Sequence, residues 1–405
     1  MQARKMAGMA VAAILLLAAE VGRADISAEV QYTVTDLGSL GGGYSIARGI
    51  NNSGQVVGSA YTSDSQWHAF RTAANQPINP ATDDLGTFGG DPSQPGADTS
   101  DAFAINDSGQ VVGYADSGGG RRAFLHSGSG PLVSTDNLGT LGGPSSYVFS
   151  HGINNSGQVA GYSSISGNSG YHAFRTAANQ PINPATDDLG TLVSGASLAF
   201  AINDSGQVVG RSEAIGGYYD NHAFRTAPNS PINPAIDDLG TFGGSQSVAL
   251  DINNSGQVVG WADTSISVDG DQVRMAFLHS GSGPLVSTDN LGTLGVDQTS
   301  MATAINNLGT VVGVCNPIHY YGGPTQRAFI YRAGGPMQDL NSLISQDSGW
   351  VLTYASDIND LGQIVGQGLL GGQNRAFRLD PIPEPASLSL LALGGLVVIW
   401  RRRAN

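Results

Sequence analysis

The chain has 405 residues and a formal net charge of −14, and only 12% of its residues are charged. Residues 25–382 contain twelve Arg and no Lys against 30 acidic residues, and this excess of negative charge argues against binding to the phosphate backbone of nucleic acids. The 58 glycines exceed the usual share of about 7% and favour turn-rich β structure over helices. The single cysteine, Cys315, excludes an intrachain disulfide.

Residues 1–24 have the layout of a secretory signal peptide. Arg4 and Lys5 form a basic start, an apolar run rich in Ala and Leu follows over residues 6–19, and small residues stand at Gly22 and Ala24. This order predicts cleavage before Asp25 and export of the remaining chain. A buried helix is the alternative interpretation of the same segment.

Residues 25–380 contain seven repeats of about 50 residues, each marked by "DLG" or "NLG", then "INNSGQVVG" or a variant of it, then "AF". The Ile of the central motif recurs at Ile50, Ile105, Ile153, Ile202, Ile252, Ile305 and Ile358. The Leu of the first motif recurs at Leu37, Leu85, Leu138, Leu189, Leu239, Leu291 and Leu340. A period of this length is the signature of a repeat architecture.

The three motifs divide each repeat into four predicted strands: one near "DLG", one entering the Ile-Asn pair, one at "QVVG" and one at "HAFR". Four short strands with their turns fill about 50 residues, the size of a propeller blade. An open stack of such units needs polar capping repeats, and neither end of the repeat region has one. The sequence therefore predicts an all-β fold, a seven-bladed β-propeller with four strands in each blade, with an open stack as the alternative.

Each central motif predicts a type I turn with a bulge, because Asn follows the Ile and Gly stands three residues later. These turn residues are Asn51 and Gly54, Asn106 and Gly109, Asn154 and Gly157, Asn203 and Gly206, Asn253 and Gly256, Asn306 and Gly309, and Asn359 and Gly362. A second glycine lies four residues further on, from Gly58 to Gly366. It is predicted to mark the close approach of another backbone, where neighbouring sheets crowd together.

The motifs "DLGTLGG", "INNSGQVVG" and "HAFR" resemble those of the HAF extracellular repeat family, over residues 32–380. The resemblance implies an exported β-repeat protein without an established activity. In four repeats Arg122, Met275, Arg327 or Arg375 replaces the His of that name. A required metal ligand would not become Met, so we expect these histidines to be structural.

The sequence predicts no catalytic residue, because "GxSxG", "HExxH", a Walker loop and a cysteine pair are all absent. Cys315 and His319 lie near each other, but no orienting acid accompanies them. No cofactor is predicted. A structural calcium ion stays open as an alternative because of the Asn and Asp in the turns, although no repeat has the spacing of a calcium loop.

The segments between "VVG" and "AF" differ most between repeats, and we expect any ligand to bind there. Flat aromatic rings beside hydrogen-bonding side chains suit sugars or partner proteins. The candidate ligand-binding residues are Tyr61, Trp67, Tyr218, Tyr219, Trp261, Tyr320 and Tyr321. The alternative is that each ring only covers its own blade.

Residues 381–405 form the last predicted segment. Pro383, Glu384 and Pro385 precede fifteen uncharged residues, and Arg401, Arg402 and Arg403 follow. A span of that length falls short of the ~20 residues of a stable transmembrane helix, so it predicts a temporary hold in the membrane. The three parts resemble a PEP-CTERM sorting signal, which implies transient recognition by an exosortase-type membrane protease in a bacterium, often one that makes extracellular polysaccharide.

Together these features predict an exported, non-enzymatic scaffold at the cell surface or in the extracellular matrix. Its expected partners are extracellular polysaccharide or surface proteins. The alternative is a propeller-fold hydrolase or lyase acting on carbohydrate, whose paired carboxylates would have to break the sevenfold pattern. A purely structural role is the third hypothesis.

Overall fold

The computed structural model describes residues 31–89, 98–167, 170–214, 220–268, 270–295, 299–316 and 326–383. The chain divides into two compact units, one made of Met1–Tyr32 with Pro381–Asn405 and the other of Thr33–Asp380. Within the first unit, the backbone N–H of Ile382 donates to the carbonyl of Gln31 at 2.8 Å. The second unit contains the repeats. Among the described residues, no helix is long and apolar enough to cross a membrane.

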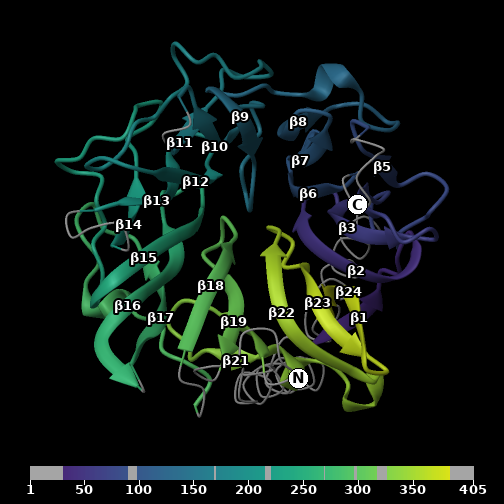
Figure 1. Ribbon diagram of the computed structural model, residues 1–405. Helices are drawn as coiled ribbons and strands as arrows, with labels where there is room; N and C mark the ends of the chain where they lie inside the picture. The colour runs from purple at the N-terminus through teal and green to yellow at the C-terminus, as the bar shows by residue number, and fades with distance from the viewer. Residues whose placement is uncertain are drawn as a thin grey trace, which may run out of the picture. The chain divides into compact units, whose positions relative to one another are not determined.

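The strands of the described residues form seven sheets of three or four strands, and Figure 1 shows them following one another in chain order. Sheet 1 contains β2 (Gly41–Ile50), β3 (Val56–Thr62), β4 (Trp67–Arg71) and β5 (Asp84–Gly86). Sheet 2 contains β6 (Ser100–Ile105), β7 (Val111–Ser117) and β8 (Gly120–His126). Sheet 3 contains β9 (Gly142–Tyr147), β10 (Ala160–Ile165) and β11 (Tyr171–Arg175).

The remaining four sheets repeat this order. Sheet 4 contains β12 (Ser197–Ile202), β13 (Val208–Glu213) and β14 (Asn221–Arg225), and sheet 5 contains β15 (Gly243–Ile252), β16 (Val258–Val268) and β17 (Asp271–His279). Sheet 6 contains β18 (Thr299–Ile305), β19 (Val311–Asn316), β20 (Arg327–Tyr331) and β21 (Gln338–Asp339). Sheet 7 contains β22 (Trp350–Ile358), β23 (Ile364–Leu370), β24 (Gln373–Pro381) and β1 (Tyr32–Asp36). The described 3₁₀ helices are Ser134–Asp136, Ser287–Asp289, Leu340–Leu343 and Gln346–Ser348.

The prediction of four strands in every unit is wrong for sheets 2, 3, 4 and 5. There the "DLG" or "NLG" segment makes a single bridge to the third strand, for example between Phe174 and Asp188. In sheets 1 to 5 the acid or amide side chain of this segment accepts the N–H of the glycine two residues later, as Asp84 does from Gly86 at 2.7 Å and Asp188 from Gly190 at 2.8 Å. This turn limits the pairing of the segment to two positions in sheet 1 and to one in sheets 2 to 5.

The "DLG" segment also belongs to a different sheet from the one expected. It pairs with the "AF" strand of the preceding repeat, as β5 does with β4. The first such segment, β1, consequently completes sheet 7, and the N–H of Leu37 donates to the carbonyl of Ala376 at 3.0 Å. The two ends of the repeat region therefore share one sheet.

In every sheet except sheet 3, the second glycine of the motif lies opposite a β-bulge of its own sheet. In sheet 1 the register between β2 and β3 shifts between Ala47 and Gly49, and Gly58 faces Ala47. A Cβ on Gly58 would overlap with the carbonyl oxygen of Ile46 on β2. The predicted close approach of another backbone is confirmed, but that backbone is the paired strand of the same sheet, whose bulge turns a carbonyl into the space, and not a neighbouring sheet.

Neighbouring sheets pack through small and branched apolar side chains and one phenylalanine. Phe124 of sheet 2 is fully buried, in a cluster that combines Ile105 and Val111 of its own sheet with Val57 and Ala69 of sheet 1. The phenylalanine of every "AF" motif is buried in the same way: Phe70, Phe124, Phe174, Phe224, Phe277, Phe329 and Phe377. Each sheet thus buries its apolar surface against the next, and not within itself.

Candidate functional site

The turn of each central motif is held by its own asparagine. Asn51 accepts the backbone N–H groups of Ser53 at 3.1 Å and Gln55 at 3.0 Å through its side-chain oxygen. Gly54 then adopts a φ of 79°, a region that glycine enters without steric cost. The glycines at this position in the other six motifs have φ between 77° and 82°.

The same asparagines link each sheet to the next. The side-chain amide of Asn51 donates to the backbone carbonyl of Asn106, which lies in the corresponding turn of sheet 2. We call the complete series the first ring. Its bonds run from Asn51 to Asn106, Asn106 to Asn154, Asn154 to Asn203, Asn203 to Asn253, Asn253 to Asn306, Asn306 to Asn359 and Asn359 to Asn51, at 3.0–3.1 Å. The series therefore returns from sheet 7 to sheet 1.

The residues after these asparagines form a second ring, and the two rings line one recess. Each of these residues donates its backbone N–H to the side-chain oxygen of its counterpart in the next sheet, at 2.8–3.0 Å. In chain order the members are Asn52, Asp107, Asn155, Asp204, Asn254, Asn307 and Asp360. No two aspartates are neighbours in this order, and each carboxylate accepts from at least one adjacent amide.

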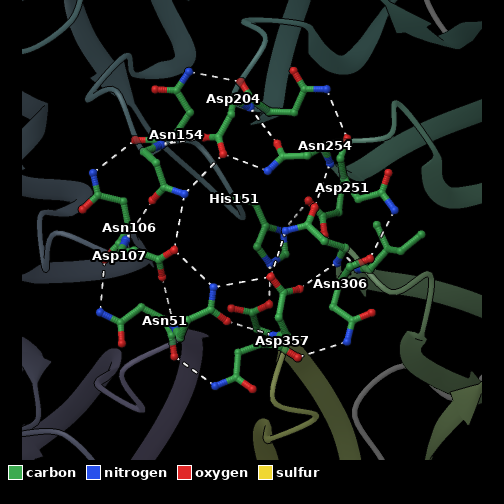
Figure 2. A pocket seen from close by; sticks show the side chains of 18 of the residues that line it. Asn51, Asn106, Asp107, His151, Asn154, Asp204, Asp251, Asn254, Asn306 and Asp357 are labelled. Carbon is green, nitrogen blue, oxygen red and sulfur yellow. Dashed lines mark hydrogen bonds and ion pairs between the residues drawn. The ribbon is translucent and has the colours of Figure 1, made fainter.

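Three side chains in the recess break the repeat: His151, Asp251 and Asp357. His151 lies between two carboxylates that come from other sheets, as Figure 2 shows. Its Nε2 is 3.0 Å from Asp357 and its Nδ1 is 3.4 Å from Asp251. Asp357 also accepts the N–H of Ile50, and Asp251 that of Ile305. The His151 cluster, defined as these three side chains, thus connects sheets 3, 5 and 7 and reaches sheets 1 and 6.

Electrostatics favour a charged imidazole in the His151 cluster. Burial alone would lower the pKa of His151, but the carboxylates of Asp251 and Asp357 outweigh it and raise that pKa to about 9. Burial raises the pKa of Asp251, against the opposing effect of His151. The recess has a volume of about 150 Å³, and its carboxylates already accept backbone and imidazole donors. This arrangement is suited to a structural role, in which the His151 cluster holds the sheets together.

The histidines of the "HAF" motifs pair with acids. His68 lies 2.9 Å from Asp84, the first residue of β5, and this bond raises the pKa of His68. The equivalent pairs are His172 with Asp188 and His222 with Asp238, both at 2.9 Å. Arg327 and Arg375 keep the pairing with Asp339 and Asp36 at 3.4 Å. Met275 stands in a repeat whose motif reads "NLG", with Asn290 in place of the acid.

A second candidate site is a cleft lined by the rings of Tyr147, Phe149, Tyr162 and Tyr171, with a volume of about 630 Å³. The ring of Tyr162 stacks on Phe149 with centroids 5.6 Å apart and an interplanar angle of 1°. It meets Tyr171 edge-on, also at 5.6 Å. Because β10 starts after the asparagine turn and β11 starts at Tyr171, Tyr171 lies at the end of sheet 3 away from the turns.

Polar side chains complete this aromatic cleft. Arg211 and Glu213 come from β13, Asn221 from β14, Gln246 from β15 and Arg121 from β8. Burial raises the pKa of Tyr162 above its usual range, so its hydroxyl stays protonated. The cleft therefore offers flat apolar faces beside both donors and acceptors, a combination typical of ligand-binding sites.

Three of the seven residues predicted to bind a ligand are described by the structure. Tyr61, 40% exposed, and Trp67 pack edge-on with centroids 5.0 Å apart, and both contact the ring of Tyr44. Trp261 is only 9% exposed and lies under the guanidinium of Arg274, so it covers its own sheet. Tyr218, Tyr219, Tyr320 and Tyr321 lie outside the described residues.

Sequence reasoning missed the aromatic cleft, although Tyr162 and Tyr171 stand in the variable segment of the third repeat, "GYSSISGNSGYHAF". It also missed the serine five residues before the Ile of most repeats. Ser100 accepts the N–H of Ala69 and donates to the carbonyl of Gly86, which joins sheets 1 and 2. The regular position of this serine was the available signal.

Other predicted sites can be placed only in part. Among the described residues, no group of three or more His, Cys, Asp or Glu side chains is arranged to hold a metal ion. Cys315 is buried, whereas His319 lies outside the described residues. Of the sorting residues, Pro383 is described, while Glu384, Pro385, Arg401, Arg402 and Arg403 are not.

Comparison with known families gives two matches. Residues 145–291 match a family described as a protein of unknown function, DUF3466, and this segment holds every lining residue of the aromatic cleft except Arg121. No curated protein matches the chain, and neither family match is to the HAF repeat. Residues 381–403 match the PEP-CTERM protein-sorting motif, which marks a protein exported for processing by an exosortase at the membrane.

Proposed function

We propose that the protein is an exported, non-enzymatic β-propeller of seven blades that binds extracellular polysaccharide. Three observations support the closed ring: seven sheets follow in chain order, the first ring of asparagine bonds returns from Asn359 to Asn51, and β1 completes sheet 7. A closed ring leaves no unpaired end of the repeat array, which accounts for the missing capping repeats. The HAF-type motifs agree with such an extracellular repeat protein.

The aromatic cleft is the observation that carries the binding function. Sugar rings present apolar faces that stack on aromatic side chains, and their hydroxyls need paired donors and acceptors. Tyr162 and Tyr171 supply such faces, while Glu213, Asn221 and Gln246 supply polar groups. Tyr171 is 38% exposed, so part of its ring is open to a ligand. A sorting motif for export agrees with a ligand outside the cell.

The proposal is tested by titrating the purified protein with the polysaccharide that its own host secretes. Binding without new reducing ends or unsaturated products is expected. Release of such products would favour the alternative of a carbohydrate-active hydrolase or lyase. Absence of binding would favour a purely structural role or the binding of a surface protein.

Variants connect the binding to the cleft. Tyr171→Ala removes one exposed stacking face and is expected to weaken binding about fivefold, since a stacked ring contributes on the order of 1 kcal/mol. The control is Leu308→Ala, which removes a 75% exposed apolar side chain beside an asparagine turn and should leave the affinity unchanged. Equal affinities for both variants and the natural protein would show that the ligand binds elsewhere.

A further inference from the structure

Arg211 differs from the other arginines of the described residues in having no partner there. The others pair with carboxylates, as Arg121 does with Asp116 at 3.2 Å, or donate to carbonyl and amide oxygens, as Arg71 does to Gly109 at 2.8 Å. Arg211 makes no hydrogen bond or ion pair with any described residue, and its Nε is buried without an acceptor. Arg211 as a whole is half-buried, and a buried N–H that lacks an acceptor costs free energy unless a ligand supplies one.

The position of Arg211 points it at the aromatic cleft. Arg211 follows the glycine at which β13 pairs with Ala199 of β12, and the corresponding residue of sheet 3 is Tyr162. Both residues line the cleft. Burial lowers the pKa of Arg211, against the effect of Tyr162, but an arginine remains charged at neutral pH. The cleft therefore places a cation beside the stacked rings.

The negative charge of the rest of the protein makes Arg211 the favoured contact for an acidic ligand. The chain has a net charge of −14, so acidic ligands are repelled from most of its surface. Glu213, the carboxylate of the cleft, forms no ion pair with Arg211 and so leaves the guanidinium open. A planar guanidinium binds a carboxylate through two parallel N–H bonds, which also fixes the orientation of the ligand.

We propose that the aromatic cleft recognises an acidic polysaccharide, with Arg211 binding the carboxylate of a uronic acid while the ring of a neighbouring sugar stacks on Tyr162 or Tyr171. This inference rests on the proposed function and adds the chemical class of the ligand. In this proposal Arg211 determines the preference for acidic over neutral sugars. The tyrosines stack on both kinds of sugar and contribute to the affinity for each.

The test compares two oligosaccharides of equal length, an oligogalacturonate and the neutral galactose oligomer, by calorimetric titration of the full chain at 0.15 M salt. The natural protein is expected to bind the acidic oligomer at least tenfold more tightly. Arg211→Gln should abolish this preference while the affinity for the neutral oligomer changes less than twofold. Arg211→Lys, which keeps the charge but not the planar fork, should retain part of the preference.

The control variant is Arg332→Gln, which removes one positive charge outside the cleft and should keep the full preference. A preference that survives in Arg211→Gln, or an equal affinity of the natural protein for both oligomers, would overturn the inference and leave polysaccharide binding standing. If neither oligomer binds, the inference about the ligand class is wrong, and the titration with the host polysaccharide decides the proposed function separately. Binding of polyglutamate with the same dependence on Arg211, but of no sugar, would mean that the cleft takes an acidic peptide instead.

Discussion

His151 connects three sheets through charge. Its imidazole, 18% exposed, lies between Asp251 and Asp357, and both carboxylates accept the N–H of a motif isoleucine in another sheet. Removing one member of a buried ion cluster leaves the others without compensation, and that loss usually outweighs the gain from the intact pair. The cluster therefore contributes to stability only while all three members are present.

We expect His151→Ala to lower the free energy of unfolding by about 3 kcal/mol, because it leaves two carboxylates facing each other in the recess. Urea unfolding at pH 6 measures this loss. The control is His172→Ala, which breaks a more exposed pair with Asp188 and should cost less than about 1 kcal/mol. Equal losses in the two variants would contradict the special role of His151.

The protonation of His151 makes the stability of the protein depend on pH. The pKa of His151 is about 9 in the folded protein against 6.5 for an unperturbed histidine, so the folded state binds the proton more tightly. The stabilisation is complete below about pH 6.5 and is lost as the pH rises through 9. The difference in unfolding free energy between the natural protein and His151→Ala should shrink over that interval. A difference that stays constant from pH 6 to 10 would show that His151 is neutral in the fold.

The alternation of Asn and Asp in the second ring makes a further prediction at this scale. Asn155 lies between Asp107 and Asp204, so Asn155→Asp would put three carboxylates in a row and replace donors with acceptors. We expect a loss of about 1 kcal/mol that high salt reduces. Asn254→Asp, which has one aspartate neighbour, is the matched control and should lose less. Thermal unfolding at low and high salt checks that Asn155→Asp loses more stability than Asn254→Asp.

At the scale of elements, the period of the motifs was enough to predict the turns and the first three strands of each repeat, but not a fourth strand in every sheet. The turn could be predicted from Asn51 and Gly54 because both act within five residues of chain. The hydrogen bonds between sheets could not be predicted. The amide of Asn51 donates to the carbonyl of Asn106 in another repeat, and the sequence does not show which turns become neighbours. The cleft was missed for the same reason, because Tyr162 and Arg211 meet only after sheets 3 and 4 pack.

The bulge beside the second glycine gives a prediction for single elements. A Cβ at Gly113 would overlap with the carbonyl oxygen of Asp101 on the paired strand β6. We expect Gly113→Ala to destabilise the protein by about 3 kcal/mol, as overpacking of a tight site does. Gly118→Ala, at a turn where a Cβ meets no atom within 4 Å, is the control. Similar melting temperatures for both variants would contradict the account of the bulge.

At the scale of the whole repeat region, the nine-residue motif serves as both a turn and a connector. Each copy ends a strand, and its two asparagine or aspartate positions bond to the next copy. Bonds of this kind join Asn359 to Asn51 and Asp360 to Asn52 across 308 residues of sequence. Gln367 adds a bond to the hydroxyl of Tyr44 at 2.8 Å. The repeated turn motif therefore joins all seven sheets through hydrogen bonds between its copies, in addition to their apolar packing.

Ring closure is tested most directly by cross-linking cysteines placed at positions 52 and 360 in a Cys315→Ser background, with peptide mapping by mass spectrometry. A pair at positions 52 and 107, neighbours in either architecture, serves as the positive control. A ring predicts that Asn52→Cys with Asp360→Cys cross-links as efficiently as Asn52→Cys with Asp107→Cys. An open stack would place positions 52 and 360 at opposite ends, so a cross-link between 52 and 107 without one between 52 and 360 would contradict the ring.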